Sequence, residues 1–147
     1  VEELVHNEGF PLFRRSGISA DSEALSPGSV ILLDSIGELA GIYAASTVSF
    51  VGGSLANVGG HNILEPASAG IPVLFGPHMH HFQDIRDAFV AENAAICVAS
   101  EEELYRRLHE LLENPSRAAT LGESAERVVR KNTGATARYV QLLQEYL

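Results

Sequence analysis

Apolar runs alternate with amphipathic stretches along most of the chain. Short runs rich in apolar and β-branched residues predict strands at Pro11–Arg15, Ser29–Asp34, Thr47–Gly52, Pro72–Gly76 and Ala94–Val98. Apolar positions three and four residues apart predict helices at Val1–Glu8, Asn62–Ala69 and around Phe82–Phe89, and also after Ser35, Ser100 and Asn114. Strands that alternate with helices are typical of a parallel sheet with helices on both faces, so the pattern predicts an α/β fold.

Helix-start signals support this assignment. Ser35 stands three residues before Glu38, and Ser100 three before Glu103, which is the spacing of a capping box. Proline is favoured at the first helical position, so Pro115 predicts a further helix. The helix after Ser100 is expected to bury a stripe of leucines, Leu104, Leu108, Leu111 and Leu112. The helical pattern then continues, with a break near Gly134, to a last apolar face made of Tyr139, Val140, Leu143, Tyr146 and Leu147.

The composition fits a folded domain and excludes several classes of protein. The chain has 147 residues, of which 46% are hydrophobic, so it is long enough for one domain and too apolar for a disordered chain. Ten Lys and Arg residues stand against nineteen Asp and Glu, and the net charge of −9 argues against nucleic acid or anionic lipid as a partner. The one cysteine, Cys97, cannot form an internal disulfide, fits a reducing cytoplasm and is expected to be a small core residue.

No leader peptide or membrane-spanning segment is predicted. Residues 1–6 lack the basic and apolar regions of a signal peptide. Residues 39–64 carry no Asp, Glu, Lys or Arg, but glycines and polar residues interrupt them, whereas a spanning helix needs about 20 predominantly apolar residues. The chain starts without methionine on what resembles the middle of a helix, so we expect it to be a soluble fragment of a longer protein.

Two loops that follow predicted strands are candidates for a ligand site. They are the glycine loop, Gly52–Asn62, and the histidine loop, Gly76–His81. Ligands of open α/β sheets bind outside the carboxyl ends of the strands. The glycine loop has four glycines and leads into a predicted helix, whose free N–H groups and dipole favour an anion such as phosphate. It lacks the Lys-Ser/Thr of a Walker loop and the G-x-G-x-x-G dinucleotide spacing, and a plain strand-to-helix turn remains the alternative.

Glu65 lies one turn into the helix that follows the glycine loop. A carboxylate at this end of a helix is stabilised by the helix dipole alone, which is one interpretation. The other is that Glu65 accepts hydrogen bonds from two vicinal hydroxyls, as in a ribose. Since a carboxylate repels phosphate, nucleotide binding would place the sugar at Glu65 and the phosphate on the loop N–H groups.

The histidines of the two loops raise the question of a metal site. They are His61, His78, His80 and His81. Metal ligands on a short loop must converge, and no Asp, Glu or Cys partner stands at a recognisable ligand spacing, so no metal is predicted. No Ser/His/Asp catalytic order can be argued from the sequence either, and we assign no catalytic residue.

Three segments closely resemble the C-terminal domain of 3-deoxy-D-manno-octulosonic acid (Kdo) transferases. They are Phe50–Leu55 (FVGGSL), Gly59–Ala67 (GGHNILEPA) and Gly70–His78 (GIPVLFGPH). Shorter matches extend the resemblance along nearly the whole chain, at Arg14–Ser16, Gly37–Leu39 and Asn132–Thr136. Members of this family are inverting glycosyltransferases with two Rossmann-like domains, the GT-B architecture. They move Kdo from CMP-Kdo onto lipid A precursors during lipopolysaccharide assembly.

The resemblance implies a role for each residue of the two loops. Gly52, Gly53 and Ser54 would lie along the donor phosphate or its sugar. Asn62 and the N–H groups around Gly59, Gly60 and His61 would hold the phosphate, and Glu65 would take the ribose hydroxyls. Gly76, Pro77, His78 and Met79 would lie near the cytosine. The family works without a catalytic metal or a cofactor, so backbone donors and the helix dipole would stabilise the departing CMP.

The resemblance also implies what the chain lacks. Residues 1–147 would form the partial, donor-binding Rossmann-like domain, without its first strands. The acceptor-binding N-terminal domain, with the carboxylate that acts as general base, would be absent, and so would the membrane anchor. The parent would work on the cytoplasmic side of the bacterial inner membrane, and the fragment alone would be inactive.

Two other functions remain open, and the fragment is also expected to form an oligomer. Another GT-B protein, such as a UDP-sugar transferase or a nucleotide-sugar epimerase, would share the glycine loop and a ribose-binding Glu. A non-catalytic oligomerisation or regulatory module could also use this fold. Missing strands would expose a sheet edge, so we expect a dimer or a strand-exchanged oligomer of the fragment.

Overall fold

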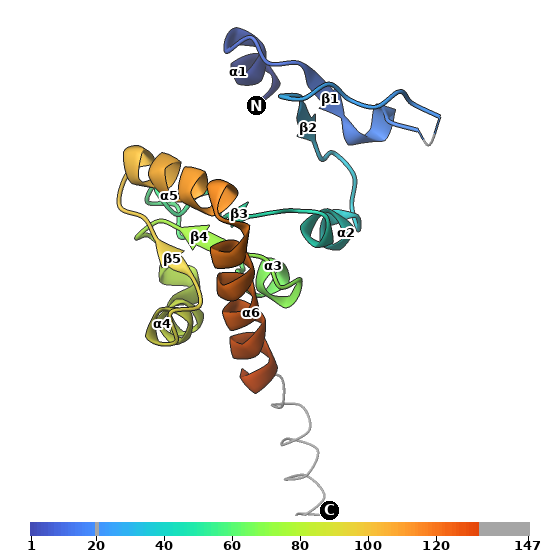
Figure 1. Ribbon diagram of the computed structural model, residues 1–147. Helices are drawn as coiled ribbons and strands as arrows, with labels where there is room; N and C mark the ends of the chain where they lie inside the picture. Colours follow the sequence, from blue (N-terminus) through green and yellow to red (C-terminus); the bar gives the residue numbers. More distant parts are fainter. Residues whose placement is uncertain (20, 133–147) are drawn as a thin grey trace, which may run out of the picture. The chain divides into compact units, whose positions relative to one another are not determined.

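The computed structural model describes residues 1–19 and 21–132 and divides into two compact units, Val1–Leu39 and Ala40–Leu147 (Figure 1). Both units contain parallel strands with helices, so the predicted α/β class is confirmed. The predicted last apolar face, between Tyr139 and Leu147, lies outside the described residues.

The first unit contains a pair of parallel strands, one α-helix before them and a short 3₁₀ helix between them. It consists of α1 (Glu2–Asn7), β1 (Leu12–Arg14), the short 3₁₀ helix η1 (Arg15–Gly17) and β2 (Val30–Leu32). β1 pairs with β2 in parallel, and the register sets Leu12 opposite Val30 and Arg14 opposite Leu32. None of the described residues of this unit is fully buried.

The capping box predicted at Ser35 does not form. The hydroxyl of Ser35 donates a hydrogen bond to the carboxylate of Glu38, and that carboxylate also pairs with Arg15 at 2.6 Å. Gly37 has a φ of +91°, which is incompatible with a helical turn at this point. The helix α2 therefore begins only at Leu39 and ends at Ala44.

The second unit contains the larger sheet and the long helices. After α2 its elements are β3 (Ser49–Phe50), α3 (Leu64–Ser68), β4 (Val73–Phe75), η2 (His80–Phe82), α4 (Gln83–Ala91), β5 (Ile96–Cys97), α5 (Glu101–Glu113) and α6 (Pro115–Asn132). The strand order is β3-β4-β5, and both pairings are parallel. Figure 1 shows the three strands side by side with α3, α4, α5 and α6 around them.

The central strand β4 is buried on both faces, as its continuous apolar run predicts. Val73 and Phe75 face a core formed with α3, α4 and the second half of α6. Leu74 faces the opposite core, which α5 and the first half of α6 complete. Helices therefore cover both faces of this sheet, which confirms the predicted layering.

The helix caps of α5 and α6 are confirmed. The N–H of Glu103 donates to the hydroxyl of Ser100 at 3.2 Å, and the Glu103 carboxylate accepts from the N–H of Ala99 at 2.9 Å. This backbone hydrogen bond lowers the pKa of Glu103. α6 starts at Pro115, and the Asn114 side chain accepts a hydrogen bond of 3.1 Å from the N–H of Arg117.

Two predictions about buried residues are wrong. Leu111 is fully buried on α5, but the adjacent Leu112 is 57% exposed, since it lies 100° further round the helix than Leu111. Cys97 is exposed rather than part of the core, because alternation along β5 turns its side chain away while Val98 is buried. Partial desolvation nevertheless raises the pKa of the Cys97 thiol.

Candidate functional site

The glycine loop and the histidine loop follow β3 and β4, which are neighbours in the sheet, and one serine joins them. Ser54 is fully buried, and its hydroxyl donates a hydrogen bond to the carbonyl oxygen of Val51. The same hydroxyl accepts a hydrogen bond of 2.7 Å from the N–H of Gly76. The carbonyl oxygen of Ser54 accepts another, of 2.9 Å, from the N–H of His78. The two loops are therefore held together where they leave the carboxyl edge of the sheet.

Two glycines permit this close approach. A Cβ atom at Gly76 would lie 2.5 Å from the backbone nitrogen of Leu55, far inside van der Waals contact. At Gly60, where φ is +71°, a Cβ atom would overlap the sulfur of Met79. Because both obstacles belong to the opposite loop, any larger residue at either position would push the loops apart.

The last part of the glycine loop offers unpaired backbone donors. The N–H groups of His61, Asn62 and Ile63 donate no hydrogen bond to any residue that the structure describes. Consecutive unpaired N–H groups at the start of a helix are the usual means of holding a phosphate. Of the backbone donors expected to hold the phosphate, the N–H of His61 is unpaired among the described residues, whereas the N–H of Gly60 donates to the carbonyl oxygen of Gly53 at 3.2 Å.

The side chain of Asn62 is partly engaged within the protein. Its side-chain oxygen accepts a hydrogen bond of 3.0 Å from the N–H of Leu64, which leaves the NH₂ group as the donor available to an anion. The helix predicted from Asn62 to Ala69 is also shorter, since α3 contains five residues, Leu64–Ser68. The dipole of so short a helix adds little, so the individual N–H groups carry the attraction.

Glu65 lies exposed in the first turn of α3, as the sequence predicts. Burial raises the pKa of the Tyr43 phenol, and the carboxylate of Glu65 raises it further. The carboxylate of Glu65 is thus electrostatically coupled to the phenol of Tyr43 on α2. Sequence reasoning did not link these two residues, because no spacing along the chain relates α2 to α3.

Two side chains predicted to bind the donor are engaged in contacts within the protein. The hydroxyl of Ser54 is used in joining the loops, so a contact with a donor would have to come from its backbone. Met79 is fully buried in the core beside β4, so a contact between the histidine loop and a base would come from the exposed Pro77 or the half-buried His78. The donor contacts of the loop residues stay predictions.

Neither a metal site nor a membrane span is found in the described part of the chain. Its His, Cys, Asp and Glu side chains form no group of three that could hold a metal ion. The helices among residues 1–19 and 21–132 are too short or too polar to cross a bilayer.

The carboxyl ends of β1 and β2 in the first unit carry a cluster of charges. Arg14 pairs with Glu2 at 2.6 Å and lies 4.0 Å from Asp34. The Asp34 carboxylate accepts hydrogen bonds from the Ser16 hydroxyl at 2.7 Å and the Ser16 N–H at 2.9 Å, which lower the pKa of Asp34. The charges of this edge are thus largely paired with one another.

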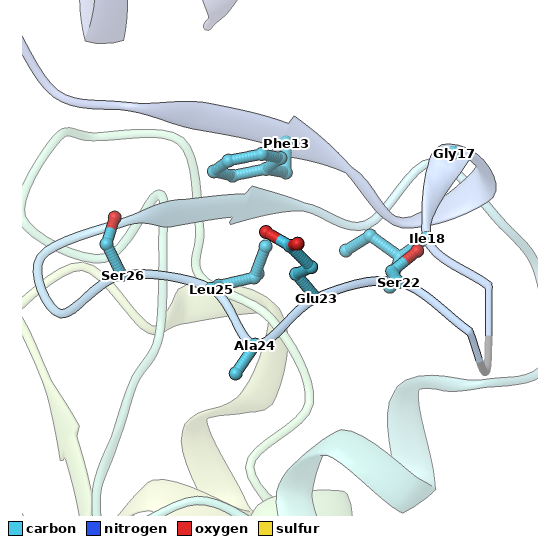
Figure 2. A pocket seen from close by; sticks show the side chains of 8 residues that line it. All are labelled: Phe13, Gly17, Ile18, Ser22, Glu23, Ala24, Leu25 and Ser26. Carbon is cyan, nitrogen blue, oxygen red and sulfur yellow. The ribbon is translucent and has the colours of Figure 1, made fainter.

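A hollow of about 470 Å³ lies beside β1, and Figure 2 shows the side chains that line it. The ring of Phe13 lies on one side, and the side chains of Glu23 and Leu25 reach towards the strands from the other. The lining mixes apolar side chains with two serines and one carboxylate, and the carboxylate repels phosphate. No residue predicted to bind a donor lines this hollow.

Comparison with known proteins finds similar sequences along most of the chain. Residues 32–144 match the family model described as glycosyl transferase-like. The 3-deoxy-D-manno-octulosonic acid transferase of Haemophilus influenzae is 37% identical over all of this chain and 34% of its own length. The transferase of the same name from Aquifex aeolicus is 44% identical over 58% of this chain and 24% of its own length. The chain thus spans about a third or less of these relatives.

A solved structure extends the likeness to three dimensions. The crystal structure of the C-terminal CMP-Kdo binding domain of WaaA from Acinetobacter baumannii is 35% identical in sequence, with a TM-score of 0.77. The match covers 87% of this chain and 65% of that one. From the family model and this shared fold we conclude that the chain belongs to the glycosyl transferase-like family.

Proposed function

We propose that the chain is the donor-binding part of a Kdo transferase, which moves Kdo from CMP-Kdo to a lipid A precursor in lipopolysaccharide synthesis. The observation that carries this proposal is the pair of joined loops at the carboxyl edge of β3 and β4, with the exposed Glu65 one turn beyond them. The names of the relatives and of the matched WaaA domain support CMP-Kdo as the donor.

The roles within the site follow from charge and hydrogen-bonding capacity. The unpaired N–H groups of His61, Asn62 and Ile63 would hold the donor phosphate. The carboxylate of Glu65 would accept hydrogen bonds from the two ribose hydroxyls, at a position where it does not compete with the phosphate. Pro77 and His78 would lie along the cytosine.

The chemistry that this part contributes is the stabilisation of the leaving group. When the bond between Kdo and CMP breaks, negative charge develops on the phosphate, and fixed N–H donors stabilise that charge without a metal. The general base that activates the acceptor would come from an acceptor-binding domain, so transfer with inversion would need the longer parent. The parent would act at the cytoplasmic side of the inner membrane, and the chain alone would bind donor without transferring it. A dimer or strand-exchanged oligomer of the chain belongs to the same proposal.

Calorimetric titration with CMP tests this function. CMP should bind more tightly than UDP. The Glu65→Ala variant should bind CMP about tenfold more weakly, because a hydrogen bond to a charged group contributes about 1.5–3 kcal/mol and tenfold corresponds to about 1.4 kcal/mol. Glu113→Ala is the matched control, since Glu113 is also exposed but lies at the end of α5.

The possible outcomes separate the alternatives. Preferential binding of UDP would favour a UDP-sugar enzyme of the same architecture. Binding of neither nucleotide would favour a non-catalytic module. An unchanged CMP affinity in Glu65→Ala would show that the ribose role of Glu65 is wrong.

A further inference from the structure

The proposed donor site lies in a part of the chain without permanent positive charge. Residues 16–85 contain no lysine or arginine, although they include both loops. The cationic residues of the second unit up to Asn132 lie on α4, α5 and α6, at Arg86, Arg106, Arg107, Arg117, Arg127, Arg130 and Lys131. Within residues 16–85, positive charge can come only from histidine, and all four histidines lie in the two loops.

Two of these histidines lie directly against the glycine loop. A Cβ atom at Gly59 would be 2.9 Å from Nε2 of His80 and would overlap Nδ1 of His81. The N–H of His81 donates to the carbonyl oxygen of Gly59 at 3.4 Å. The two rings meet edge to face with centroids 4.5 Å apart. Gly59 is buried while both histidines are exposed, so their rings cover the loop backbone and still reach solvent.

We propose that His80 and His81 are the cationic part of the donor site and bind an oxyanion of the nucleotide-sugar when they are protonated. The inference rests on the proposed function and adds two residues to the site. The oxyanion is either the phosphodiester or the carboxylate of the sugar, and each of these groups carries one negative charge. Charge-assisted hydrogen bonds from imidazolium to an oxyanion are stronger than those from neutral imidazole.

The charged groups around these rings determine the sign of the pH effect. His61 lies on the glycine loop and His78 on the histidine loop, so all four imidazoles of residues 16–85 belong to the two joined loops. Glu65 in the first turn of α3 and Asp84 in the first turn of α4 are negative and repel an anion. Imidazole side chains gain their charge between about pH 8 and pH 5, so donor affinity should rise as the pH falls through this range.

The test measures binding of three probes to the full chain at pH 8.0 and pH 5.8. A CMP alkyl ester has a phosphodiester whose charge stays constant over this range, unlike that of CMP. It should bind about fivefold more tightly at the lower pH if the histidines contact the phosphodiester, since an exposed pair of opposite charges contributes up to about 1 kcal/mol. If they contact the sugar carboxylate, CMP-Kdo should show this gain and the ester should not. Cytidine should show no gain.

Variants separate charge from packing. His80→Gln and His81→Gln keep a polar side chain without the charge and should reduce the pH-dependent gain by at least half. His81→Lys supplies a permanent charge and should bind the donor at pH 8.0 about as tightly as the unaltered chain does at pH 5.8. His109→Gln on α5 is the matched control and should keep the full gain.

The outcomes distinguish this inference from the proposed function. If the chain binds the donor with the same affinity at both pH values, or if the Gln variants keep the full gain, His80 and His81 are not the cationic part of the site, while the function stands. If His81→Lys and His81→Gln weaken binding equally at both pH values, His81 only packs on Gly59, and the inference is wrong. If no probe binds at either pH, both proposals fail together.

Discussion

The two compact units of the chain are stabilised by different forces. In Ala40–Asn132 the strand β4 is buried on both faces, and apolar side chains from α3, α4, α5 and α6 complete two cores. In Val1–Leu39 no described residue is fully buried, Ile31 is 50% exposed, and ion pairs such as Arg14 with Glu2 link the elements. Exposed ion pairs contribute little to stability, whereas buried apolar side chains contribute much. The joined loops thus belong to the unit that has the buried cores.

The largest contrast between the units is expected from removing one phenylalanine in each. Phe75→Ala deletes a fully buried ring from the centre of β4 and should lower the free energy of unfolding by about 3–5 kcal/mol. Phe13→Ala is the counterpart, since Phe13 on β1 is 37% exposed, and it should cost less than about 1 kcal/mol. Urea denaturation followed by circular dichroism measures both. Equal losses would contradict the difference between the units.

A smaller effect is expected from one methyl group between the loops. Gly76→Ala places a Cβ atom against the backbone of Leu55 and should destabilise the second unit by about 1–3 kcal/mol, with weaker CMP binding as a consequence. Gly52→Ala is the matched control, because a Cβ atom there meets no atom within 4 Å, and it should change stability by less than about 0.5 kcal/mol. Similar melting temperatures for the two variants would show that the loops can move apart without loss of stability.

The smallest effect is a pH dependence of the first unit. Hydrogen bonds from Ser16 lower the pKa of Asp34, so this contact stabilises the unit above the unfolded pKa of the carboxyl and is lost as the pH falls through the folded pKa. NMR signals of β1 and β2 should therefore shift towards unfolded positions below about pH 4, before those of β4. Asp34→Asn should weaken this transition, and Asp21→Asn should leave it unchanged. Simultaneous loss of both units would contradict the prediction.

Patterns that depend on local chemistry were predicted well from the sequence. The capping residues of α5 act within a few positions of one another, so Ser100 and Glu103 indicate the helix start directly. The apolar run of β4 likewise predicts a strand buried on both faces. The positions of the two loops follow from the ends of their strands, so their place at the carboxyl edge of the sheet is predictable from the sequence.

Features that depend on tertiary contacts were not predicted. The capping spacing at Ser35 fails because Glu38 pairs with Arg15, a residue distant in sequence, and because Gly37 takes a positive φ. The burial of Met79 depends on Gly60 from the other loop, which no periodicity reveals. The electrostatic coupling of Tyr43 to Glu65 similarly depends on how separate elements pack.

The hydroxyl of Ser54 makes one backbone amide a reporter on two loops. The N–H of Gly76 belongs to the histidine loop, but its acceptor belongs to the glycine loop. Its exchange with solvent deuterium therefore requires the loops to separate, and its protection measures the free energy of that opening. A donor that contacts both loops would slow this exchange even if it touched neither Ser54 nor Gly76.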